Sequence, residues 1–139
     1  MRRLATAVLL AGVLATAPAV FARSTVPVTE REIAFTGAAG KTFDAETLRR
    51  AIISGGQRRQ WDMVPSADGK SIKGSYSWNR NKHSIVLDIR PTATGYSFKY
   101  LDSVNMKYEM ENGVPHIHPH YNKFVDDLIQ SIRTELSKL

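Results

Sequence analysis

The chain contains no cysteine. It therefore cannot form disulfides, hold a metal ion with thiolates or use a thiol nucleophile, and packing has to supply its stability. A bacterial lipoprotein is anchored through a cysteine that follows its cleavage site. Here Arg23 occupies that position, so we expect no lipid anchor.

The chain also lacks a hydrophobic run long enough to cross a bilayer. The longest run, Leu4–Ala17, has fourteen residues, whereas a spanning helix needs about 20. Arg2 and Arg3 precede this run, and a small-residue cut site after Ala22 follows it, as in secretory signal peptides. The sequence predicts a cleaved signal peptide over residues 1–22, a periplasmic location and no membrane span.

Acidic residues are few in the middle of the chain. The formal net charge is +6, and residues 45–90 hold nine Lys or Arg against four Asp or Glu. Arg58 and Arg59 lie in this segment. A basic surface of this kind suits an acidic envelope protein or another anionic envelope component, and its alternative is a solvated surface without a partner.

The remaining pattern is that of one domain over residues 33–139, after a flexible lead at 23–32. A short strand is expected at 33–35. A helix is expected to start after Asp44, which can cap it, and to end at Gly55–Gly56. Apolar residues then alternate in four segments, and a second helix carries an apolar stripe at spacings of three and four. The four alternating segments are 61–64, 72–78, 85–90 and 96–101, and the stripe runs from Tyr121 to Leu136.

These elements predict an α+β fold. Four alternating segments separated by short turns are typical of an antiparallel meander with one buried face. A helix on each side of them in the sequence predicts a two-layer domain, with the N-terminal and the C-terminal helix packed on one face of a four-stranded sheet.

Three histidines alternate at His116, His118 and His120. In an extended segment their imidazoles would face one way, and imidazole is the commonest ligand of zinc, copper and nickel. The flanking prolines disturb this alternation, and a structural site normally needs four ligands. A periplasmic metal site is therefore one hypothesis; its alternative has His118 capping the last helix and the other two histidines on the surface.

No catalytic constellation stands out. Asp102, Ser103 and His83 are the residue types of a hydrolase triad, but a triad is defined by geometry and the chain has no Gly-x-Ser-x-Gly elbow. We assign no catalytic residue, and a small hydrolase with an unrecognised site remains an alternative. No motif indicates a cofactor or a nucleic acid partner.

Several segments together resemble a family of small, uncharacterised exported proteins and lipoproteins of proteobacteria. The segments are Tyr96–Ser103, Asn105-Met106-x-Tyr108 and Ile117-His118-x-x-Tyr121-Asn122-x-Phe124. They are similar to the pattern YSI.Y.DS.NL.Y followed by IH..YN.W, with Phe124 in place of the tryptophan. The resemblance covers about residues 44–139. It implies an exported α+β domain and no established activity.

The polar residues of these segments have two interpretations. They either join the end of the meander to the start of the last helix by hydrogen bonds, or they form a binding surface. The residues are Asp102, Ser103, Asn105, His118 and Asn122. Our leading hypothesis is a non-catalytic periplasmic domain that binds an envelope partner, through the basic segment or through the His118 and Asn122 end. The oligomeric state stays open.

Overall fold

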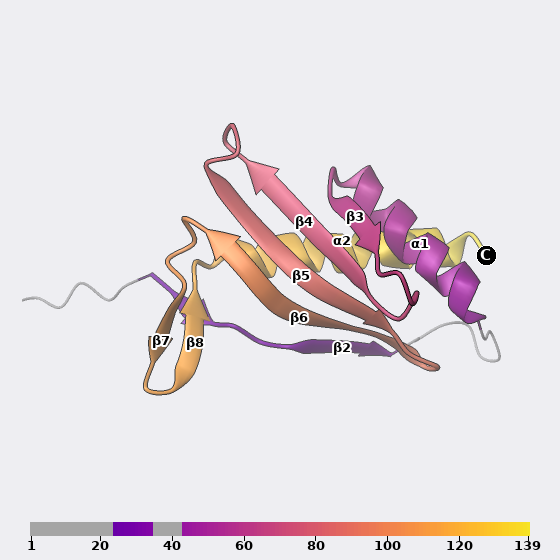
Figure 1. The fold of residues 1–139 in the computed structure, drawn as a ribbon, viewed down its shortest axis with the longest axis horizontal. Coiled ribbons are helices and arrows are strands. Elements are labelled where there is room, and N and C mark those ends of the chain that lie inside the picture. Colours follow the sequence, from indigo (N-terminus) through magenta and orange to yellow (C-terminus); the bar gives the residue numbers. More distant parts are fainter. Residues whose placement is uncertain (1–23, 35–42) are drawn as a thin grey trace, which may run out of the picture.

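The computed structural model describes residues 24–34 and 43–139. The expected signal peptide at 1–22 lies outside the described residues. Within the described ranges, no helix is both long and apolar enough to cross a membrane. The fold is α+β, with two helices that pack on each other and two antiparallel sheets (Figure 1).

The larger sheet is a five-stranded antiparallel sheet with the order β2-β6-β5-β4-β3. The predicted meander forms its last four strands, and the prediction of only four strands is wrong by one. The additional strand comes from the expected strand at 33–35 and pairs with β6, so that Ile33 lies opposite Tyr96. The strands are β2 (Arg31–Ala34), β3 (Asp62–Pro65), β4 (Ile72–Trp78), β5 (His83–Pro91) and β6 (Gly95–Val104).

A second, three-stranded sheet has the order β1-β8-β7 and was not expected from the sequence. Its strands are β1 (Val26–Pro27), β7 (Glu109–Glu111) and β8 (Val114–Ile117). Asn112 and Gly113, with φ of 50° and 78°, form the two-residue turn between β7 and β8, as in type I′ hairpins. The segment 23–32, expected as a flexible lead, supplies β1 and the first two residues of β2.

The first helix, α1, spans Ala45–Arg58, and the second, α2, spans His120–Ser137. Asp44 caps α1 as predicted, because its carboxylate accepts a hydrogen bond of 2.7 Å from the Thr47 amide. The prediction that Gly55–Gly56 ends α1 is wrong, since both glycines lie inside the helix.

A close approach of the two helices explains why α1 continues through its glycines. A Cβ atom on Gly55 would lie 2.8 Å from the Cα of Ile132 in α2. The Ser131 hydroxyl of α2 also donates a hydrogen bond of 2.7 Å to the Gly55 carbonyl. Glycine destabilises a helix by about 1 kcal/mol relative to alanine. At Gly55 the close contact of the two helix backbones compensates for this loss.

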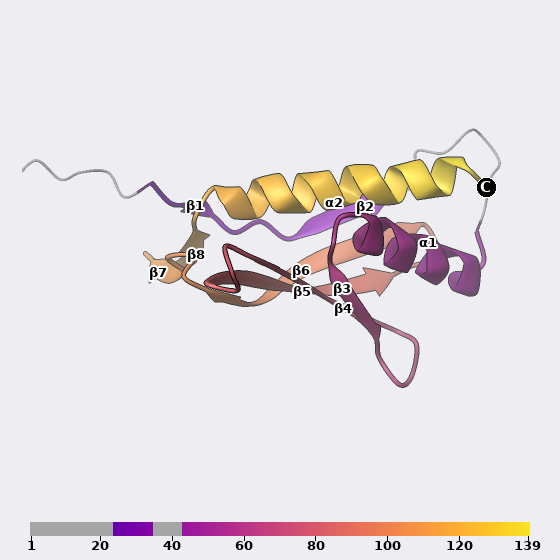
Figure 2. The ribbon, with the colours of Figure 1, turned by 90° about the horizontal axis from the view of Figure 1, so that it is seen from above.

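Both helices lie on one side of the larger sheet (Figure 2). Burial alternates along β5, where Ile85, Leu87 and Ile89 are fully buried while Val86 and Asp88 between them are not. Their side chains join residues of α1 and α2 in a single core cluster. Lys73 and Lys99 lie on the other, solvent-facing side of the sheet, as the period of two requires.

The helix contact at Gly55 yields a matched pair of substitutions. We expect Gly55→Ala to destabilise the protein by about 1–3 kcal/mol, because the new methyl group meets the backbone of Ile132. Gly56→Ala is the comparison, since the three atoms nearest to its methyl group all belong to the side chain of Met63, which can change rotamer where a backbone cannot move aside. Urea denaturation of both variants tests this, and equal losses of stability would contradict the backbone contact.

Candidate functional site

A shallow hollow of about 530 Å³ lies beside the last residues of β6. We call it the β6 hollow. It holds three of the polar residues selected from the sequence, Asp102, Ser103 and Asn105, together with residues that were not selected. Its lining consists of Tyr100, Leu101, Asp102, Ser103, Asn105, Met106, Lys107 and Tyr108.

An irregularity in β6 shapes the hollow. Tyr100 lies opposite Leu87 and Asp102 opposite Val86, so Leu101 has no partner on β5. Such a bulge bends the strand and changes the side to which the following side chains point. Leu101 is consequently 52% exposed.

Hydrogen bonds within the hollow join its polar side chains to one another. The hydroxyl groups of Tyr100 and Ser103 lie 2.8 Å apart, and the Asp102 carboxylate accepts a bond of 2.8 Å from the Ser103 amide. The rings of Tyr100 and Tyr108 stack with their centres 4.4 Å apart and their planes 2° from parallel. Stacked rings and closed bonds make the wall of the hollow stiff.

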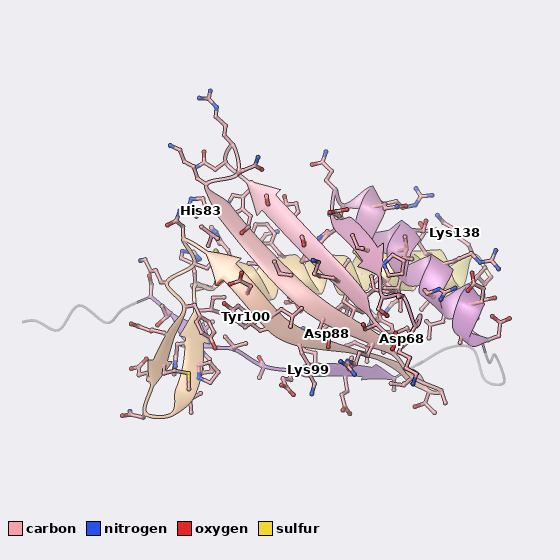
Figure 3. The ribbon with its side chains drawn as sticks, in the orientation of Figure 1. Asp68, His83, Asp88, Lys99, Tyr100 and Lys138 are labelled. Atoms are coloured by element: carbon pink, nitrogen blue, oxygen red, sulfur yellow. The ribbon has the colours of Figure 1, made fainter. Side chains whose placement is uncertain are left out.

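The geometry around Ser103 differs from that of a hydrolase triad. Its hydroxyl contacts the Tyr100 phenol. Burial raises the pKa of that phenol, so the phenol stays protonated at neutral pH and does not act as a base. The imidazole of His83 lies 3.1 Å from the carbonyl oxygen of Asn105. His83 and Tyr100 lie toward the same end of the sheet, opposite Lys138 (Figure 3).

His118 connects the hollow to the start of α2. Its amide donates a bond of 2.8 Å to the carbonyl of Met106, and its imidazole Nδ1 accepts a bond of 3.1 Å from the amide of His120. The helix begins at His120 with Pro119 as its N-cap residue, which makes no side-chain hydrogen bond. His118 therefore performs the predicted capping role from one position further out.

The three alternating histidines do not converge on one point. The His118 and His120 rings lie 4.4 Å apart. His116 instead contacts the Val114 carbonyl at 3.0 Å and the Glu111 carboxylate at 3.5 Å. Over residues 24–34 and 43–139, no group of three or more His, Asp or Glu side chains is placed to hold a metal ion.

The other selected residues lie outside the hollow. Arg58, at the end of α1, forms an ion pair with Glu135 of α2, and Arg59 is the exposed C-cap residue of α1. Asn122 lies half-buried in the first turn of α2. The structure thus brings Asp102, Ser103 and Asn105 into one hollow, which the Met106 carbonyl links to the backbone of His118. It leaves Arg58, Arg59 and Asn122 outside the hollow.

Large apolar side chains are exposed mainly at this end of the molecule. Five of the seven that are exposed among the described residues lie between positions 101 and 114. This surface was not predicted, although Asn112-Gly113 is the strongest kind of short signal for a β-hairpin. The five are Leu101, Val104, Tyr108, Met110 and Val114.

Comparison with protein-family models, curated proteins and solved structures finds no match for this chain. The resemblance to a family of exported proteins therefore stays a prediction. The site has to be interpreted from its own geometry.

The lowered pKa of His118 makes the stability of the folded protein depend on pH. Burial lowers the pKa of His118, and the nearby charges of His120, Lys107 and His83 lower it further. Below the ordinary value of about 6.5 the unfolded chain binds a proton that the folded protein resists, so this contribution to stability falls with decreasing pH. Protonation of Nδ1 would also replace the acceptor that caps α2.

We expect His118→Asn to reduce this loss of stability between pH 7.5 and 5, because an amide oxygen accepts the same bond without titrating. Thermal unfolding over that pH range measures the effect, and His116→Asn serves as the control for removing a histidine elsewhere. A His118→Asn profile that runs parallel to that of the unmodified protein would contradict the assignment.

Proposed function

We propose that this protein is a non-catalytic, periplasmic domain that binds a protein partner of the cell envelope. The contact surface is the end of the molecule that holds the β6 hollow and the β7–β8 hairpin. The signal peptide predicted over residues 1–22 supports the location, and the alternation of polar and apolar groups in the hollow supports binding.

The observation that carries this proposal is the concentration of exposed apolar side chains at that end. Leu101 and Tyr108, which line the hollow, are 52% and 43% exposed. Met110 on the neighbouring hairpin is 62% exposed. A group of exposed apolar residues beside polar ones is typical of a protein contact surface.

The chemistry of the hollow favours binding over catalysis. Ser103 is paired with a protonated phenol, and Asp102 accepts a backbone amide. Neither arrangement activates a nucleophile, which requires a base within hydrogen-bonding reach. Both arrangements fix side chains in place, and fixed side chains lose less entropy when a partner binds.

The basic segment 45–90 supports a contact surface less well. Its charges lie on separate elements, and several are neutralised locally. Arg49 and Arg50 pair with Glu46, Arg58 with Glu135 and Arg90 with Asp88. Each such pair places a negative charge beside the arginine and so weakens the attraction of that arginine for an anionic partner.

Site-specific photocrosslinking in the cells that export the chain tests the proposal. With benzoylphenylalanine at Tyr108 we expect a discrete protein adduct, and with the same group at Arg59 we expect none. The charge reversal Arg58→Glu with Arg59→Glu should leave the yield of the Tyr108 adduct unchanged. No adduct from Tyr108, or adducts from Arg59 alone, would refute the proposed surface.

A further inference from the structure

Strand β7 forms an open edge of the smaller sheet, since the strand order is β1-β8-β7. It pairs with β8 so that Met110 lies opposite Pro115, and Glu109 and Glu111 lie opposite His116 and Val114. In an antiparallel ladder, opposed residues alternate between pairs that exchange two hydrogen bonds and pairs whose polar groups point away from each other.

Proline decides which kind of pair Met110 belongs to. Pro115 has no amide hydrogen, and its carbonyl accepts a bond of 2.8 Å from Val28, on the β1 side of β8. The pair of Met110 and Pro115 is therefore the kind that exchanges no hydrogen bond. It follows that the amide and the carbonyl of Met110 point away from β8, toward the open edge.

The side chains of β7 add a chemical pattern to this edge. Successive residues of a strand point to opposite faces, so Met110 projects from one face and both glutamates from the other. Met110 is 62% exposed. The edge thus offers one donor, one acceptor and an apolar side chain, flanked by two carboxylates on the opposite face.

This pattern opposes pairing with a second copy. A two-fold pairing of β7 strands centred on Met110 would place Glu109 of each copy opposite Glu111 of the other. Like charges directly opposite each other destabilise a strand pair, and charged residues are a common protection of open edges. A strand with basic residues at the same two positions would instead gain from the negative charge of both glutamates, although the Glu111 carboxylate also lies 3.5 Å from the His116 imidazole.

We propose that β7 binds an extended segment of a partner protein as an added strand, and that this segment has the pattern basic–apolar–basic. The central residue of the segment lies opposite Met110, exchanges two backbone hydrogen bonds with it and packs its side chain on that of Met110. The two basic residues face Glu109 and Glu111. The inference rests on the proposed function and names the class of partner that the same end of the molecule takes.

Strand addition combines backbone bonds, which give affinity, with side-chain contacts, which give specificity. The backbone amide and carbonyl of Met110 at the open edge supply the hydrogen bonds that give affinity. The two glutamates give specificity, because they attract a basic strand and repel an acidic one or a second copy.

The test uses the purified chain and a fluorescent peptide, acetyl-Thr-Lys-Val-Lys-Thr-amide. We expect saturable binding by fluorescence anisotropy, with the largest amide shift in the NMR spectrum at Met110. A peptide N-methylated at its valine keeps the charges but cannot donate to the Met110 carbonyl, and it should bind about tenfold more weakly. The same peptide with glutamate in place of both lysines should not bind.

Protein variants separate the contribution of the backbone hydrogen bonds from that of the glutamate charges. Met110→Pro removes the donor at the open edge and should weaken the unmethylated peptide about tenfold. Glu109→Gln with Glu111→Gln should weaken it and reduce its salt dependence, whereas Glu46→Gln on α1 is the matched control and should change nothing. If Met110→Pro does not fold, the N-methylated peptide tests the same bond on the unmodified chain.

Three results would overturn the inference. The first is equal affinity for the methylated and unmethylated peptides, which would leave only charge attraction. The second is dimerisation of the free chain that Met110→Pro abolishes, and the third is binding of anionic phosphatidylglycerol vesicles that competes with the peptide. If the peptide fails but the Tyr108 adduct forms, this inference falls and the proposed function stands; if both fail, both fall.

Discussion

The crossing of α1 and α2 at Gly55 determines where α2 lies, and the rest of the molecule is arranged around α2. Because Gly55 has no side chain, the backbone of α1 lies directly against the backbone of α2 at Ile132. The Ser131 hydroxyl, bonded to the Gly55 carbonyl, fixes the helices along their axes. With this crossing in place, the apolar stripe of α2 covers the buried face of the larger sheet (Figure 2).

The start of α2 and the residues just before it contact both the smaller sheet and the β6 hollow. Tyr121 is 2% exposed, and its ring packs edge-on to that of Tyr100 with their centres 6.0 Å apart. Just before the helix, Ile117 is fully buried and His118 holds the Met106 carbonyl. Burial of each such side chain stabilises the fold by about 1.5–3 kcal/mol, so β8 is anchored firmly at its last residue.

Stability decreases from this anchor toward the turn of the hairpin. β7 has three residues, and Met110 contributes exposed rather than buried apolar surface. Elements with few buried contacts open at low free energy, and binding segments are commonly drawn from them. The proposed binding element is thus a short hairpin with an open edge, attached to a more stable core.

The sequence was sufficient where one physical effect acted alone. Alternation along β4 and β5 and the stripe of α2 predicted the meander and the last helix, because a single buried face dictates both patterns. The α1 boundary failed at Gly55–Gly56, since a tertiary contact overrode the local preference of glycine. Pairing of β2 with β6 joins segments far apart in the chain, so no local pattern could report it.

The candidate site was predicted only in part. Asp102 and Ser103 do line the hollow, but their side-chain hydrogen bonds stay within β6. The link to the last helix is the backbone bond from the His118 amide to the Met106 carbonyl. Tyr108 was overlooked as a site residue because its stacking on Tyr100 is a tertiary contact that no local pattern reports. Whether the backbone groups of Met110 face the open edge depends on its pairing with Pro115. That pairing is a property of the strand register.

Amide hydrogen exchange of Met110 in the free protein tests the central claim most directly, since it reports whether the β7 edge is open. We expect the Met110 amide to exchange nearly as fast as in an unstructured peptide. The amide of His116, which faces Glu109 across the ladder, should exchange measurably more slowly under the same conditions. Protection of Met110 comparable to that of His116 would show that the edge is already occupied and would contradict the account.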